Sequence, residues 1–86
     1  MFIFGDIGNS ETKVFLVSSN NRIIKNINFP SNKINEKTLN LKLKILVKDF
    51  KKIRKILFCS VVPKSFNLIK KFLSKKTKIR CYEVKD

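Results

Sequence analysis

The residues with the clearest chemical potential lie in one short stretch, Asp6-Ile7-Gly8-Asn9-Ser10, which Lys13 follows three residues later. A tight glycine turn between two strands exposes backbone N–H groups, and these can hold phosphate oxygens. An Asp at the end of the first strand can hold Mg²⁺ through water, because this cation keeps much of its hydration. The Asn and Ser side chains can donate to phosphate, and Lys13 could place a positive charge near the same anion. The same residue types also make ordinary hairpin turns, so local chemistry alone leaves both interpretations open.

The neighbouring residues place this stretch between two strands. Residues 1–4 form a continuous apolar run that is typical of a buried strand. Residues 14–17 form a second β-prone run, and residues 23–29 form a third, closed by Pro30. Ser18 to Asn21 is a turn signal between the second and third runs. The first thirty residues therefore predict a meander of three hairpin-connected strands.

The segment that follows the polar residues 31–35 fits two patterns. Leu39, Leu41, Leu43 and Ile45 alternate like a strand. A longer set of apolar residues, at spacings of three and four, fits a helical stripe instead: Leu39, Leu43, Leu46, Val47, Phe50 and Ile53. Because the stripe outlasts the alternation, we predict a helix that Asn35 could cap and that has Lys51 and Lys52 near its carboxyl end.

The rest of the chain predicts a strand, a helix and a last strand. Residues 56–62 are a dense apolar and β-branched run, which indicates a buried strand. Pro63 suits the first turn of a helix, whose buried face would hold Phe66, Ile69, Phe72 and Leu73. Residues 78–84 alternate again. The predicted order is β-β-β-α-β-α-β, an α/β fold with a mixed sheet in one domain.

The composition raises a second functional class. The 86 residues suffice for one small domain, and 20 Lys and Arg against 6 Asp and Glu give a net charge of +14. Such a charge is typical of a nucleic-acid or anionic-membrane binder. However, 17 of the 20 cations are Lys, they are spread along the whole chain, and no pattern resembles an RRM, KH or OB domain. A small basic nucleic-acid-binding domain is therefore the alternative, and specific nucleic-acid binding is not expected.

The cysteines and the apolar runs exclude other classes. Cys59 and Cys81 are too far apart for a metal-ligand pair, and each is predicted to be a small core residue without a disulfide. The apolar run at the amino terminus is too short for a signal peptide, and no run approaches the length of a membrane span. We therefore expect a cytoplasmic protein with no membrane partner.

Two motifs carry a resemblance to a known family. Asp6-Ile7-Gly8-Asn9-Ser10 is similar to the D-x-G-N-[TS] opening of type III pantothenate kinases, several of which also have a lysine at the position of Lys13. Cys59-Ser60-Val61-Val62-Pro63 resembles the S-S-V-V-P run of that family, at the end of a strand before a helix. The chain departs from the family at Cys59, where Ser is usual, and at Gly5, where a bulkier residue is common.

The resemblance covers essentially all 86 residues and implies a fold and an activity. The fold would be the ribonuclease H-like half of a two-lobed ATPase of the actin-like, sugar-kinase-like superfamily. Residues 1–86 would be its amino-terminal ATP-binding lobe, with the second lobe and the catalytic residues expected beyond Asp86. The parent enzyme would phosphorylate pantothenate to 4′-phosphopantothenate, the first step of coenzyme A biosynthesis, and would commonly be a homodimer. Another kinase of the superfamily, such as a sugar kinase, is a further alternative.

The resemblance also implies cofactors and site residues. The cofactors would be ATP, Mg²⁺ and a monovalent cation, K⁺ or NH₄⁺, whose site would lie mostly in the missing half. Asp6 would serve the metal, and Asn9, Ser10 and Lys13 would make the direct side-chain contacts with ATP. Ser60 and Val61 would be structural. The isolated chain is expected to be catalytically incomplete and marginally folded. The expected cofactor-binding residues are Asp6, Ile7, Gly8, Asn9, Ser10, Glu11, Thr12 and Lys13.

Overall fold

The computed structural model describes residues 1–84 and contains one five-stranded sheet and two α-helices. The elements are β1 (Phe2–Ile7), β2 (Glu11–Val17), β3 (Ile23–Pro30), the 3₁₀ turn η1 (Ser31–Lys33), α1 (Glu36–Leu46), the 3₁₀ turn η2 (Phe50–Lys52), β4 (Lys55–Ser60), α2 (Pro63–Lys76) and β5 (Cys81–Val84). This order confirms the predicted β-β-β-α-β-α-β arrangement.

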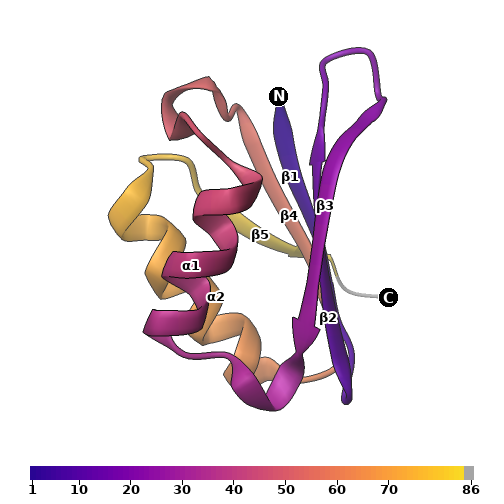
Figure 1. The fold of residues 1–86 in the computed structure, drawn as a ribbon, viewed down its shortest axis with the longest axis vertical. Helices are drawn as coiled ribbons and strands as arrows, with labels where there is room; N and C mark the ends of the chain where they lie inside the picture. Colours follow the sequence, from indigo (N-terminus) through magenta and orange to yellow (C-terminus); the bar gives the residue numbers. More distant parts are fainter. Residues whose placement is uncertain (85–86) are drawn as a thin grey trace.

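The sheet is mixed, with the strand order β3-β2-β1-β4-β5. β1 lies at its centre and pairs antiparallel with β2 and parallel with β4, while β4 pairs parallel with β5. Both helices lie on the same side of the sheet (Figure 1). The fold is therefore the ATPase-like half that the family resemblance implies.

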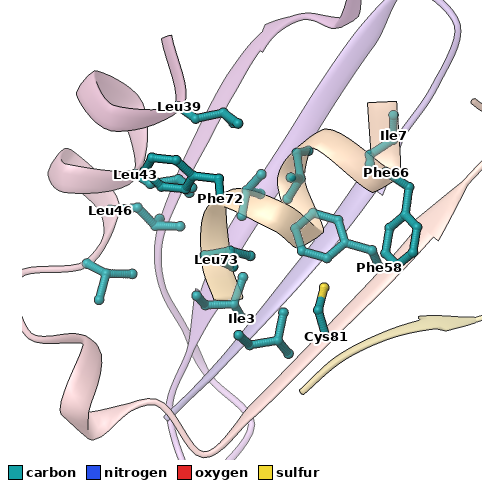
Figure 2. Close-up of a cluster of buried hydrophobic side chains, with 14 of the residues drawn as sticks. Ile3, Ile7, Leu39, Leu43, Leu46, Phe58, Phe66, Phe72, Leu73 and Cys81 are labelled. Carbon is teal, nitrogen blue, oxygen red and sulfur yellow. The ribbon is translucent and has the colours of Figure 1, made fainter. Parts of the chain in front are cut away.

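The core lies between this helical layer and one face of the sheet. Along β1, the alternate residues Ile3, Gly5 and Ile7 are buried. Figure 2 shows Ile3 and Ile7 on the same side of the sheet as the apolar side chains of the two helices, among them Leu43 of α1 and Leu73 of α2. The opposite face of β1 carries Phe2, Phe4 and Asp6, because side chains in a strand alternate between the two faces.

Gly5 has a steric reason to be a glycine. An ideal Cβ at this position would lie 2.0 Å from the Cε1 atom of Phe58, its partner on β4. The Phe58 side chain is fully buried, and its ring also packs against Phe66 with 6.3 Å between the ring centroids. The Phe58 ring thus fills the space that a bulkier residue before Asp6 would need, which gives the departure at Gly5 a physical explanation.

The first helix ends earlier than predicted. The side-chain oxygen of Asn35 accepts a hydrogen bond from the N–H of Thr38 at 2.9 Å, which confirms the cap. The helix stops at Leu46, however, so Lys51 and Lys52 lie in η2 and not at its carboxyl end. The Asp49 side chain accepts from the N–H of Lys51 at 3.0 Å, and such local side-chain bonds compete with helix continuation.

The burial of α1 decides between the two patterns. Leu39 and Leu43 are 2% and 1% exposed, whereas Leu41 and Ile45 are 64% and 48% exposed. A strand would place all four on one face, so the alternation was coincidental. Val47 and Ile53 belong to the predicted helical stripe but follow the end of α1. Both are buried nonetheless, because the chain turns back along the core.

Several strand boundaries and two burial predictions need correction. β1 continues through Ile7 and β2 begins at Glu11, because this pair of strands stays in register up to Ile7 and Thr12. β4 ends at Ser60, and Val61 is 66% exposed rather than part of a buried strand. β5 begins only at Cys81. Cys81 is buried as predicted, but Cys59 is only half-buried and lies outside the core.

The contact between Gly5 and Phe58 generates the first prediction. We expect Gly5→Ala to lower the free energy of unfolding by about 1–3 kcal/mol, because the methyl group overpacks the core. Adding Phe58→Leu should recover part of this loss, with a favourable coupling of about 0.5–3 kcal/mol. Urea unfolding of the single and double variants measures the coupling.

Phe72→Leu provides the matched control, since Phe72 is equally part of the core but is not among the nearest neighbours of Gly5. Its effect should add to that of Gly5→Ala without coupling. Equal coupling of Gly5→Ala to both phenylalanine substitutions would show that the ring of Phe58 is not the constraint.

Candidate phosphate-binding site

A tight hairpin turn connects β1 and β2 at the carboxyl end of β1. The N–H of Gly8 donates to the carbonyl oxygen of Glu11 at 3.0 Å, which closes the turn around Asn9 and Ser10. Gly8 therefore does not offer its N–H to a phosphate. Within residues 1–84, the backbone N–H groups of Asn9 and Ser10 donate to no backbone acceptor, and both residues are exposed. These two neighbouring amides are therefore free to donate to an anion, and such paired N–H groups can hold phosphate oxygens.

Glycine is needed at position 8 for space rather than for an unusual backbone angle. No described glycine has a positive φ. A Cβ at Gly8 would instead lie 3.1 Å from the carbonyl oxygen of Glu11. The close approach of the two strands thus selects the residue.

Two buried hydroxyl groups hold the hairpin in place. The Ser31 hydroxyl donates to the carbonyl oxygen of Gly8 at 2.6 Å and lies 2.8 Å from the hydroxyl of Thr12. The N–H of Ser31 also donates to the carbonyl oxygen of Ser10 at 3.0 Å. Since Ser31 and Thr12 are 7% and 0% exposed, water competes little for these bonds. The turn is therefore fixed before any ligand arrives.

Asp6 and Lys13 are neighbours on the sheet face opposite the helices. They are direct cross-strand partners of β1 and β2, so their Cβ atoms are about 4.5–5.5 Å apart. Both side chains are exposed. On its other side, Asp6 is paired in register with Cys59 of β4. An acidic and a basic side chain therefore leave the sheet side by side, close to the turn.

A cleft of about 370 Å³ extends from Asp6 to the beginning of α2. Its lining also includes Cys59, Val61 and Pro63. The carboxyl ends of the parallel strands β1 and β4 meet here, which is where ligands bind in open α/β sheets. Pro63 is the first residue of α2, so the positive end of the helix dipole lies at the cleft.

Ser60 shapes the chain between β4 and α2. Its hydroxyl donates to the carbonyl oxygen of Val62 at 2.9 Å and accepts from the N–H of Val62 at 3.0 Å. The N–H of Val61 donates to the carbonyl oxygen of Ile7 at 3.1 Å, which ties this turn to the end of β1. These bonds agree with the structural role expected for Ser60 and Val61, although Val61 acts through its backbone.

The structure brings the eight expected residues together in one hairpin but divides them by exposure. The side chains of Ile7 and Thr12 are fully buried, so these two residues can offer a ligand only backbone atoms. Gly8 is half-buried. The residues with exposed side chains are Asp6, Asn9, Ser10, Glu11 and Lys13. Sequence reasoning missed Ser31, since nothing in a polar loop after Pro30 signals that its hydroxyl turns inward.

The hairpin carries two exposed carboxylates, Asp6 in β1 and Glu11 at the beginning of β2. Within residues 1–84, no group of three or more His, Cys, Asp or Glu side chains gathers to hold an ion. An exposed carboxylate at the edge of a cleft, as Asp6 is, suits Mg²⁺, which keeps several waters and shares phosphate oxygens with one or two protein carboxylates. Asp6 is the residue at the hairpin that fits this pattern.

The fold and the hairpin define a class of protein, an ATPase-type lobe with a tight glycine turn between its first two strands. The family model described as type III pantothenate kinase matches residues 2–86, and the chain belongs to this family. This assignment favours pantothenate kinases over the sugar kinases as the relevant branch of the superfamily.

A curated relative supports the assignment. The type III pantothenate kinase of Pelagibacter ubique (strain HTCC1062) is 53% identical to this chain over 85 residues. The matched region is 99% of this chain and 34% of the relative, so the chain spans about a third of the relative's length. Among the described residues, neither helix is long and apolar enough to cross a membrane.

The hydroxyl network generates the second prediction. We expect Ser31→Ala to lower the free energy of unfolding by about 1–3 kcal/mol, because the half-buried Gly8 carbonyl and the buried Thr12 hydroxyl lose a partner. Hydrogen exchange of the amides in the hairpin should also accelerate. Ser74→Ala is the control, since the exposed Ser74 hydroxyl donates within α2 to the carbonyl oxygen of Lys71. Equal stability losses in the two variants would contradict a pinning role for Ser31.

The two thiols generate the third prediction. Burial raises the pKa of the Cys81 thiol to about 11, an effect that the nearby Lys70 charge partly offsets. Since the thiolate is the reactive form, Cys81 should resist iodoacetamide at pH 8 while the half-buried Cys59 is alkylated. Peptide mapping by mass spectrometry measures both rates, and Cys59→Ser isolates that of Cys81. In denaturant Cys81 should react; rapid reaction in the folded chain would show that it is not protected.

Proposed function

We propose that residues 1–86 form the ATP-binding lobe of an enzyme that transfers the γ-phosphoryl group of ATP to pantothenate. This reaction yields 4′-phosphopantothenate and is the first step of coenzyme A biosynthesis. The observation that carries the proposal is the family match over residues 2–86, which includes an exposed and pinned phosphate hairpin. Because the chain spans 34% of its relative, pantothenate and the catalytic base would be held by the rest of the enzyme.

Within this lobe the hairpin residues have separate roles. The amides and side chains of Asn9 and Ser10 bind phosphate oxygens at the exposed tip. The Lys13 ammonium group adds a positive charge on the same face. Ile7, Gly8 and Thr12 hold the shape of the turn, and the Glu11 carbonyl closes it. Transfer itself requires the phosphates to be held rigidly and their charge neutralised, and a turn fixed by buried hydrogen bonds meets the first requirement.

Asp6 is the residue proposed for Mg²⁺. When bound with ATP, this ion neutralises charge on the phosphates. The exposed Asp6 carboxylate would orient it from the end of β1, and the neighbouring Lys13 would limit the net charge of the pair. By the family resemblance we further propose a monovalent cation, K⁺ or NH₄⁺, held mostly by other parts of the enzyme, a homodimeric enzyme, and a location in the cytoplasm, where ATP is used.

The test of this function is a chimera that contains the rest of a relative. In it, residues 1–86 replace the matching third of the Pelagibacter ubique protein, a replacement that 53% identity makes feasible. We expect ATP-dependent phosphorylation of pantothenate by the chimera and none by residues 1–86 alone. Asp6→Asn should lower kcat by about 10²-fold or more, because a metal-binding charge acts on the transition state. A coupled assay of ADP release measures the rates.

The controls separate a site effect from a general loss. Glu36→Gln removes an exposed carboxylate at the start of α1, remote from the hairpin in the sequence, and should leave kcat unchanged. Lys13→Gln should raise the KM for ATP, while Lys37→Gln on α1 should not. A chimera that folds but does not phosphorylate pantothenate, or an Asp6→Asn chimera with full activity, would overturn the corresponding part of the proposal.

A further inference from the structure

A second cleft, of about 590 Å³, lies between the turn η2 and the connection from α2 to β5. The two segments lie side by side at one end of the molecule (Figure 1). A hydrogen bond ties the chain just after η2 to the residue before β1. The N–H of Arg54 donates to the carbonyl oxygen of Met1 at 2.7 Å. The phosphate hairpin lies at the other end of β1. Six strand residues separate the two ends, which corresponds to roughly 20 Å.

The lining of this cleft is strongly cationic. No carboxylate is among the residues that line it in the described part of the chain, whereas five of them carry a positive charge. The nearest acidic residue in the sequence, Asp49, directs an oxygen to the N–H of Lys51. Like charges around one concavity repel each other, and a bound anion relieves this repulsion. The five cations are Lys51, Arg54, Lys75, Lys76 and Lys78.

The interior of the cleft strengthens this attraction. Phe50, Ile53 and Ile79 give it an apolar floor. Charge interactions are stronger beside such low-dielectric walls than in open water. The hydroxyl of Thr77 accepts from the N–H of Ile79 at 3.1 Å, so its own proton is directed elsewhere and can be donated to an anion. The cleft therefore combines charge, a hydrogen-bond donor and partial exclusion of water.

We propose that this cleft binds a small anion that carries two or more phosphate groups. The ammonium group of Lys76 lies over the Phe72 ring, at 5.6 Å from its centroid, which leaves four cations for the concavity. Four cations still exceed what a single phosphate needs and suit a compact ligand of high charge. The cations line one pocket, and this favours a small ligand over a nucleic-acid strand. The proposal is independent of the function assigned to the hairpin.

Chemical-shift mapping tests this site directly. The ¹⁵N-labelled 86-residue chain is titrated with tripolyphosphate at physiological salt. We expect saturable shifts of the amides in residues 50–54 and 74–79, assigned separately from any shifts of residues 8–13 at the hairpin. If the amides of the hairpin shift and those of the cleft do not, the proposal is wrong and the proposed function remains intact.

Charge-matched variants separate the cleft from the general basicity of the chain. The triple variant K51Q/K75Q/K78Q should bind tripolyphosphate at the cleft on the order of tenfold more weakly. The control K25Q/K37Q/K44Q has the same net charge and should retain binding within about twofold. Lys51, Lys75 and Lys78 line the cleft, whereas Lys25, Lys37 and Lys44 do not. All six lysines are exposed. Equal weakening in both variants would show nonspecific attraction only.

Two further measurements keep the outcome decisive. Lys78→Gln alone lies outside every helix and strand, so it should weaken binding without affecting the fold. A thymidine oligonucleotide of roughly 12 nucleotides serves as the competing class of ligand. If it binds at the cleft and tripolyphosphate fails to displace it, the cleft is a nucleic-acid surface and the proposal is wrong. Displacement by tripolyphosphate supports the small-anion site.

Discussion

The alternation of side chains along β1 is the constraint on which both layers of the molecule depend. Ile3, Gly5 and Ile7 face the core, and this places Asp6 on the opposite face, beside the hairpin. Slipping the register of the strand by one residue would exchange the two sets. Asp6 would then enter the core, where an unpaired carboxylate is costly to bury. The burial of the apolar residues of β1 thus places Asp6 on the exposed face of the sheet, and Asp6 itself need not form a contact for this.

Packing in the core also fixes the position of the residues that line the cleft beside Asp6. Phe58 packs directly over Gly5 and is completely buried, which fixes β4 against β1. Since β4 runs parallel to β1, its next residue, Cys59, must stand beside Asp6, and the strand ends at Ser60 where the hydroxyl forms its turn. The positions of the candidate ligand-binding groups therefore follow from apolar packing one residue earlier in each strand.

Local chemistry and periodicity predicted much of this from the sequence. The Asn35 cap, the start of α2 at Pro63 and the buried stripe of α2 follow from rules that involve only neighbouring residues. The end of α1 could not be predicted in this way, because the apolar spacing continues to Ile53 while the Asp49 side chain stabilises a turn. Apolar periodicity predicts which residues are buried, and Ile53 is buried just after η2 although α1 does not extend to it.

The features of the site that sequence reasoning missed depend on contacts between distant segments. Ser31 bonds to Gly8, 23 residues away, and to Thr12, 19 residues away. Neither separation leaves a pattern in the sequence, since a hydroxyl in a polar loop has many possible partners. The second cleft was hidden for the same reason, because η2 and the residues around Thr77 meet only after the sheet has formed.

The distribution of charge gives the two ends of the sheet different characters. At the hairpin, Lys13 pairs across the strands with Asp6, and Glu11 adds a second exposed carboxylate. Binding of phosphate there, as proposed, would therefore depend on amide geometry more than on charge. At the second cleft no carboxylate among the described lining residues offsets the cations, so charge itself dominates. A net charge of +14 alone predicts attraction for any polyanion. In the folded chain, the hairpin and the second cleft differ in charge. Of the two, the hairpin is better suited to select a ligand by geometry.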